Sequence, residues 1–116
     1  MSKGRQELKA DFFSSTTIDY PIRPWAKIAL DIMGLFSLAP QHQRNCLVAT
    51  CFYIKWQEVH FCGEVTTASI IRWLKYMFSR FGLPVEIVTD NGPQFTSHEF
   101  LSFIRLHAIR HTYNAV

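Results

Sequence analysis

The stretch at residues 87–97 constrains this chain more than any other, because it joins three kinds of structure within a short span. It reads Ile-Val-Thr-Asp-Asn-Gly-Pro-Gln-Phe-Thr-Ser. The β-branched residues at its start favour a strand, and the Asn-Gly-Pro sequence after Asp90 is typical of a turn. Asp90 therefore lies where a strand ends, which is a natural place for metal chemistry if a second carboxylate lies nearby. An Asp at this position can equally serve the turn alone.

A helix is predicted to begin directly after that turn. Thr96 has the character of an N-cap, and Glu99 is placed where a capping box has its acidic residue. Phe95 and Phe100 are spaced as the matching hydrophobic staple. The buried stripe of this helix is predicted to contain Phe100, Phe103, Ile104 and His107.

The remaining chain predicts further strands and one longer helix. Apolar and β-branched runs indicate strands at 27–33, 46–53, 56–61, 85–89 and 110–115. The run at 46–53 is almost continuously apolar, as in a strand buried on both faces. A helix capped by Thr66 or Thr67 is predicted to end before Gly82. One face of that helix is predicted to carry Ile71, Leu74, Phe78 and Phe81. The element order is then β-β-β-α-β-α-β, with an antiparallel meander at its start.

Asp31 is the second carboxylate in an unusual position. Ile28, Leu30 and Ile32 alternate along the first strand, so Asp31 points to the opposite face. Strands are depleted in Asp, and burial of an unpaired carboxylate is costly. Asp31 must therefore face solvent, a partner or a metal, and an ion pair with Lys27 or an Arg is the alternative.

Asp31 and Asp90 can reach one site if their two strands are parallel neighbours. The helix between the third and fourth strands is a crossover of suitable length for that arrangement. Two close carboxylates repel each other unless a cation lies between them, and Mg²⁺ or Mn²⁺ suits such an oxygen-rich site. Sites of this kind support phosphoryl transfer.

Charge, cysteine spacing and hydropathy narrow the class of protein. The formal charge of +3 and the pI of about 8.9 allow a nucleic-acid partner without requiring one. Cys46, Cys51 and Cys62 lack zinc-site spacing. This pattern favours reduced thiols in an intracellular protein. No apolar run is long enough for a membrane span, so no membrane partner is expected.

Four motifs in order carry a family resemblance. Arg-Pro-Trp at 23–25 precedes the strand with Asp31 and Gly34, Lys-Trp-Gln-Glu-Val occupies 55–59, Phe-Gly-Leu-Pro occupies 81–84, and Thr-Asp-Asn-Gly-Pro-Gln-Phe-Thr-Ser follows at 89–97. Together they resemble the catalytic core of retroviral and gypsy-type retrotransposon integrases over residues 24–116. Residues 1–23 read as an irregular lead-in with a short helix near residues 7–13.

The resemblance implies a fold, a reaction and a set of partners. The fold would be α/β and RNase H-like with a five-stranded mixed sheet, and Asp31 and Asp90 would be the first two acids of an Asp-Asp-Glu triad. The triad would bind Mg²⁺ or Mn²⁺ and transfer DNA 3′ hydroxyls into target DNA. DNA would be the partner, a homodimer is possible, and no small-molecule substrate is expected. The location would be nuclear. The residues beside DNA would be Asn91, Gly92, Pro93 and Gln94.

The sequence departs from the family pattern at two places. The family spacing puts the third acid beyond position 116, and the helix that would carry it is absent, so the core is expected to be truncated and strand transfer lost. The family usually has Asp and Ser where this chain has Cys51 and Ile54.

Two other functions remain open. The first is a non-enzymatic domesticated module that binds DNA or protein, with a candidate basic surface formed by Arg72, Lys75, Arg80, Arg105 and Arg110. Those charges can equally form a solvated surface. The second is another RNase H-like nuclease or transposase, which the sequence around Asp90 disfavours.

Overall fold

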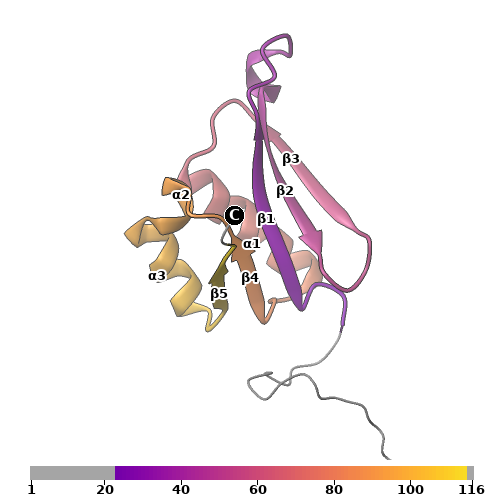
Figure 1. Cartoon of the computed structure of the whole chain (residues 1–116), viewed down its shortest axis with the longest axis vertical. Coiled ribbons are helices and arrows are strands. Elements are labelled where there is room, and N and C mark those ends of the chain that lie inside the picture. Colours follow the sequence, from indigo (N-terminus) through magenta and orange to yellow (C-terminus); the bar gives the residue numbers. More distant parts are fainter. Residues whose placement is uncertain (1–22, 115–116) are drawn as a thin grey trace, which may run out of the picture.

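A five-stranded mixed sheet with the order β3-β2-β1-β4-β5 forms the centre of the fold (Figure 1). The computed structural model describes residues 23–114. Antiparallel pairing joins β1 (Lys27–Gly34), β2 (Asn45–Cys51) and β3 (Gln57–Cys62). Parallel pairing then adds β4 (Glu86–Thr89) and β5 (Arg110–Tyr113). The predicted five-stranded mixed sheet and the RNase H-like fold class are confirmed. The helix expected near residues 7–13 and the predicted end of the last strand at 115 lie outside the described residues.

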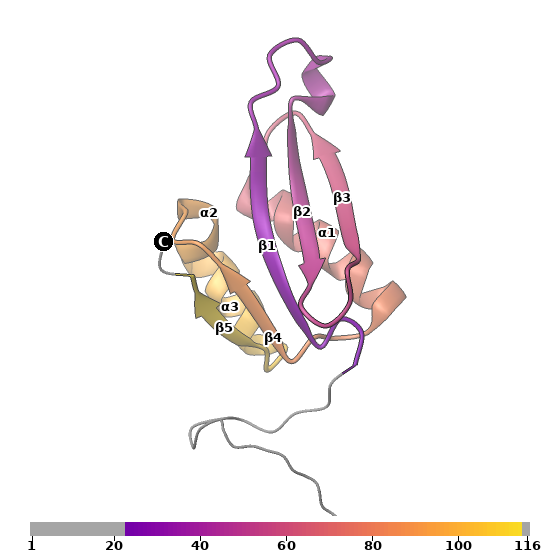
Figure 2. The same ribbon diagram turned by 45° about the vertical axis from the view of Figure 1, so that its right-hand side comes forward.

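Helices cover one face of this sheet, as Figure 2 shows. The main ones are α1 (Thr67–Phe81) and α3 (His98–Leu106), and both pack on the same core cluster. A four-residue helix, α2 (Pro93–Thr96), links β4 to α3, and a 3-10 turn (Gln41–Gln43) lies between β1 and β2. None of the described helices is long and apolar enough to cross a membrane.

The predicted apolar face of α1 was displaced by about one residue from the face that is buried. The side chains buried against the sheet are Ile70, Trp73, Leu74 and Met77. Phe78 instead stacks on Phe103 of α3 with ring centroids 6.0 Å apart, and Phe81 stacks on Trp25 at 4.8 Å. The helix is apolar over a wide arc, so only its neighbours decide which part of that arc meets the sheet.

The predicted capping box at Thr96 is wrong. Ser97 is the N-cap of α3, and its side chain accepts a hydrogen bond from the backbone N–H of Phe100 at 3.2 Å. Thr96 is instead the last residue of α2. Pro93 at the first position favours that extra helical turn, because its φ is already helical. Phe95 and Phe100 still pack edge to face, with centroids 5.4 Å apart.

The second predicted strand ends earlier than expected. β2 stops at Cys51, and residues 52–56 form the turn into β3. Phe52, Ile54 and Trp56 are exposed there, although the apolar run suggested burial. Burial on both faces is confirmed within β2 itself, where Leu47 and Ala49 face the helices and Cys46 and Val48 face the other side.

Candidate metal and nucleic-acid site

Asp31 and Asp90 lie at matching positions of neighbouring parallel strands. The register of β1 and β4 pairs Lys27 with Glu86 and continues to Ala29 with Val88. Continued two residues further along both strands, the same register sets Asp31 beside Asp90. The alternation of side chains puts both on the sheet face that no described helix covers. The expected parallel arrangement of the two strands is therefore present.

A cavity of about 230 Å³ opens beside the middle of β1 and the end of β4. Both carboxylates line it, and both are exposed to solvent. Neither forms an ion pair within residues 23–114. Asn114, which the sequence did not single out, also lines the cavity, and its backbone N–H donates to the Thr89 carbonyl at 2.6 Å. Carboxylate oxygens such as those of Asp31 and Asp90 are suitable ligands for a hard cation such as Mg²⁺ or Mn²⁺.

Asp90 also takes part in the turn that follows β4. Its Oδ1 accepts a hydrogen bond from the backbone N–H of Gly92 at 2.8 Å. A hydrogen bond that an Asp side chain accepts from the backbone N–H two residues further on defines an Asx turn. One carboxylate oxygen is thus held in place, and the other remains available to a ligand. Asp90 thus both stabilises the turn and lines the cavity, so the two interpretations are compatible.

His111 on β5 supports this turn from the helix-covered side, and no functional role was predicted for it. Its Nε2 lies 2.7 Å from Thr89 Oγ1, which itself donates to the Asp90 carbonyl at 2.9 Å. Desolvation by burial lowers the pKa of His111. No sequence pattern marked His111, because its pairing with the core residue Ile87 depends on the register of β4 and β5.

The residues expected beside DNA differ in their surroundings. Asn91 and Pro93 are exposed next to Asp90, and Gly92 is half-buried. Gln94 is tied to the start of α1, because its side-chain Nε2 donates to the Val65 carbonyl at 3.3 Å. Its backbone carbonyl also accepts from the Thr67 hydroxyl at 3.2 Å. Gln94 therefore fixes the loop rather than projecting freely from it.

The candidate basic residues do not gather around the cavity. Arg72, Lys75 and Arg80 are on α1, which covers the sheet face opposite to Asp31, and Arg80 pairs with Glu58 at 3.5 Å. Arg105 and Arg110 are exposed on α3 and β5. Five scattered cations do not make one surface with the two carboxylates.

Cys51 and Ile54, where the family usually has Asp and Ser, also lie away from the cavity. Cys51 is buried, pairs with Ile28 and accepts a hydrogen bond from the Trp25 N–H at 3.3 Å. Ile54 is exposed in the turn after β2. Neither side chain lines the space between Asp31 and Asp90. Within the described residues no group of three or more His, Cys, Asp or Glu side chains could hold a metal ion.

Comparison with known proteins gives the family. The model of the Integrase core domain family matches residues 22–116. The chain belongs to this family. An uncharacterized protein of Caenorhabditis elegans is 33% identical to this integrase core domain over 96 residues, which is 83% of the chain and 7% of that protein. The Gag-Pro-Pol polyprotein of Mason-Pfizer monkey virus is 47% identical over 49 residues, which is 42% of the chain and 3% of the polyprotein.

Solved structures agree on the fold of the integrase core domain. A chain of the simian T-cell lymphotropic virus intasome, solved with a PP2A regulatory subunit, has a TM-score of 0.68 and 24% identity. That match covers 84% of this chain and 34% of the other. The HTLV-2 integrase catalytic core domain, solved with magnesium, has a TM-score of 0.67 and 23% identity over 78% of this chain and 60% of its own. This chain thus spans only part of the relatives that it matches.

Proposed function

We propose that this chain is the part of a DNA integrase core that holds a divalent cation between Asp31 and Asp90. The observation that carries the proposal is the parallel pairing of β1 and β4, whose register, continued two residues beyond Ala29 and Val88, brings Asp31 and Asp90 next to each other. Both side chains line one open cavity, and neither is neutralised by a cation in the described residues. The magnesium found with the HTLV-2 core gives the same expectation by similarity.

In this proposal each residue has one task. Asp31 and Asp90 bind the cation, and the Gly92 N–H keeps the Asp90 carboxylate oriented. A divalent ion held by two carboxylates can polarise a phosphodiester and stabilise its leaving oxygen. The exposed residues Asn91 and Pro93 contact the DNA backbone next to this site, and Gln94 holds their loop against α1.

The 116 residues on their own are expected to bind the cation weakly and to lack strand transfer. Asp31 and Asp90 are the only acids that line the cavity in the described part of the chain. Residues that act as one catalytic unit lose most of their effect when a member is absent. This favours, as a second candidate for the chain alone, a module that binds nucleic acid or protein without catalysis.

Manganese titration followed by NMR tests the metal site. Mn²⁺ should broaden the signals of Ala29, Val88 and Asn114 first, because their residues line the cavity with the two acids. Asp31→Asn and Asp90→Asn should each weaken this effect about tenfold. Glu64→Gln is the matched control, because Glu64 is exposed and lies outside the cavity. Equal broadening in all variants would refute the site.

Binding and strand-transfer assays with labelled DNA distinguish an active integrase core from a module that binds without catalysis. Affinity that falls steeply with salt and weakens in an Asn91→Glu variant supports DNA contact through the loop. Strand-transfer product formed by the 116-residue chain with Mn²⁺, and lost in Asp90→Asn, would contradict the expected lack of catalysis. DNA affinity that is unchanged by Asn91→Glu would exclude the loop as a contact.

A further inference from the structure

β3 forms an edge of the sheet, with β2 on its inner side and no described strand on its outer side. The Cys51 N–H donates to the Trp56 carbonyl at 3.0 Å, which fixes the bonding pattern between β2 and β3. Antiparallel bonding alternates along a strand, so Glu58 and His60 also direct their backbone groups toward β2. The backbone groups that point outward are therefore those of Gln57, Val59 and Phe61.

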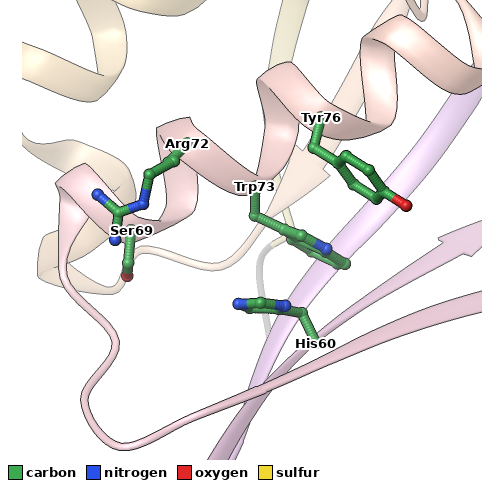
Figure 3. Close-up of a pocket in the computed structure, with 5 residues that line it drawn as sticks. All are labelled: His60, Ser69, Arg72, Trp73 and Tyr76. Atoms are coloured by element: carbon green, nitrogen blue, oxygen red, sulfur yellow. The ribbon is translucent and has the colours of Figure 1, made fainter.

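A groove runs beside this edge, between β3 and α1. It has a volume of about 420 Å³ and is lined by His60, Ser69, Arg72, Trp73 and Tyr76 (Figure 3). The His60 ring stacks on Trp73 with centroids 5.7 Å apart. Figure 3 shows Arg72 beside Ser69 at one end of the groove and Tyr76 at the other. The groove therefore has aromatic walls and a cation at one end.

A strand added to β3 would place alternate side chains in this groove. Side chains on neighbouring strands point to the same face at paired positions. A residue opposite His60 would thus face the helix side, where the groove lies, and a residue opposite Val59 would face the other side. Val59 and Phe61 are 48% and 53% exposed there. The edge consequently offers an apolar contact on one face and a polar, aromatic one on the other.

Charge indicates which side chain the groove would accept. Arg72 and Lys75 are exposed on α1, and neither forms an ion pair in the part of the chain that is described. Arg80 is already paired with Glu58. A carboxylate near Arg72 and His60 would gain charge-assisted hydrogen bonds. The chemistry of the groove thus favours an acidic side chain alternating with apolar ones.

We propose that the outer edge of β3 and its groove bind an extended acidic peptide of another protein by strand addition. The peptide forms main-chain hydrogen bonds with Gln57, Val59 and Phe61, and every second peptide side chain enters the groove between β3 and α1. The surface lies at the sheet edge beyond β2, so the inference is independent of the metal site at Asp31 and Asp90.

Fluorescence anisotropy with a defined probe tests this binding. The probe is the capped, labelled peptide Thr-Val-Glu-Val-Glu-Val-Thr, added to the 116-residue chain. Its Lys-for-Glu counterpart should bind at least about tenfold more weakly. Arg72→Glu should lower the affinity for the acidic peptide by a similar factor. Lys55→Glu makes the same charge change outside the groove and should change this affinity by less than about twofold. Equal binding of both peptides would overturn the proposal.

Proline at the edge tests the strand pairing directly. Val59→Pro removes only an outward N–H, which an edge strand tolerates, and should abolish binding, whereas Val59→Thr should preserve it. Circular dichroism melting confirms that both variants fold, and slowed hydrogen exchange at Val59 on peptide addition gives a second readout. Binding that survives in folded Val59→Pro would overturn the proposal. Outer-edge amides already protected in a dimer of this chain, or displacement of the peptide by DNA alone, would do so as well.

Discussion

His111 Nε2 and Thr89 Oγ1 lie 2.7 Å apart, and Thr89 lines the candidate metal cavity directly before Asp90 in the chain. The Thr89 hydroxyl donates its hydrogen to the Asp90 carbonyl, so it can only accept a hydrogen bond from His111 Nε2. In the neutral ring Nε2 then carries the hydrogen and Nδ1 carries none. Nδ1 is buried without a hydrogen-bond partner among the described residues. Protonation of this ring would therefore bury an unpaired N–H, which is costly. The geometry favours the neutral imidazole, in agreement with its lowered pKa.

The free energy of unfolding should consequently decrease as the pH is lowered, and His111 should account for part of this decrease. The unfolded ring titrates near its ordinary pKa of 6.5, and the folded ring takes up a proton only at lower pH. The unfolded chain then binds more protons, so the free energy of unfolding decreases as the pH falls below about 6.5 toward the folded pKa. Urea unfolding from about pH 7 to about pH 5 measures this slope. His111→Gln should flatten it, and His42→Gln, at an exposed position, should not. Equal slopes in both variants would contradict the assignment.

Asp90→Ala and Asp90→Asn should differ in stability. Alanine removes the acceptor of the Gly92 N–H and should lower the free energy of unfolding by about 1 kcal/mol. Asparagine keeps an oxygen at that place, so its effect on folding should be small while its effect on metal binding stays large. Thermal melting with and without Mn²⁺ measures both. Equal destabilisation by the two substitutions would show that the side-chain acceptor contributes nothing to the turn.

Ser97→Ala and Thr96→Ala locate the start of α3 in solution. Ser97 caps the helix through its bond with the Phe100 N–H, so its loss should cost about 1 kcal/mol. The Thr96 hydroxyl makes only a 3.5 Å contact with the Pro93 carbonyl, so its removal should change stability by less than about 0.5 kcal/mol. Chemical unfolding curves give both numbers, and the reverse order would restore the cap predicted at Thr96.

Gly34→Ala should be more harmful than Gly82→Ala. Both glycines have positive φ, at 134° and 89°, so both substitutions strain the backbone. A Cβ at Gly34 would also lie 2.6 Å from the Arg44 carbonyl oxygen, whereas one at Gly82 meets nothing within 4 Å. We expect a loss of about 3 kcal/mol at Gly34 and about 1 kcal/mol at Gly82 from unfolding curves. Similar losses at both would show that the strand end adjusts around the added carbon.

Much of the candidate site could be predicted because it depends on local pattern and on connection length. The alternation around Asp31 fixes the face of its side chain, and a single helical crossover before Asp90 favours parallel neighbouring strands. The role of His111 could not be predicted, because it depends on which residue of β4 lies beside it. Asn114 was missed for the same reason, since it reaches the cavity only through the register of β5 and β4.

The sequence by itself determined the succession of the five strands along the chain, the limits of α1, and the positions of Asp31 on the first strand and Asp90 directly after the fourth. These features follow from periodicity and turn chemistry, which act between residues close in the chain. Only the tertiary structure decided that Ile70 and Met77 face the sheet, that Ser97 caps α3, and that the edge of β3 adjoins an aromatic groove with Arg72 at one end. Those features depend on which elements pack together, and local sequence does not encode the neighbours of a surface that is apolar over a wide arc.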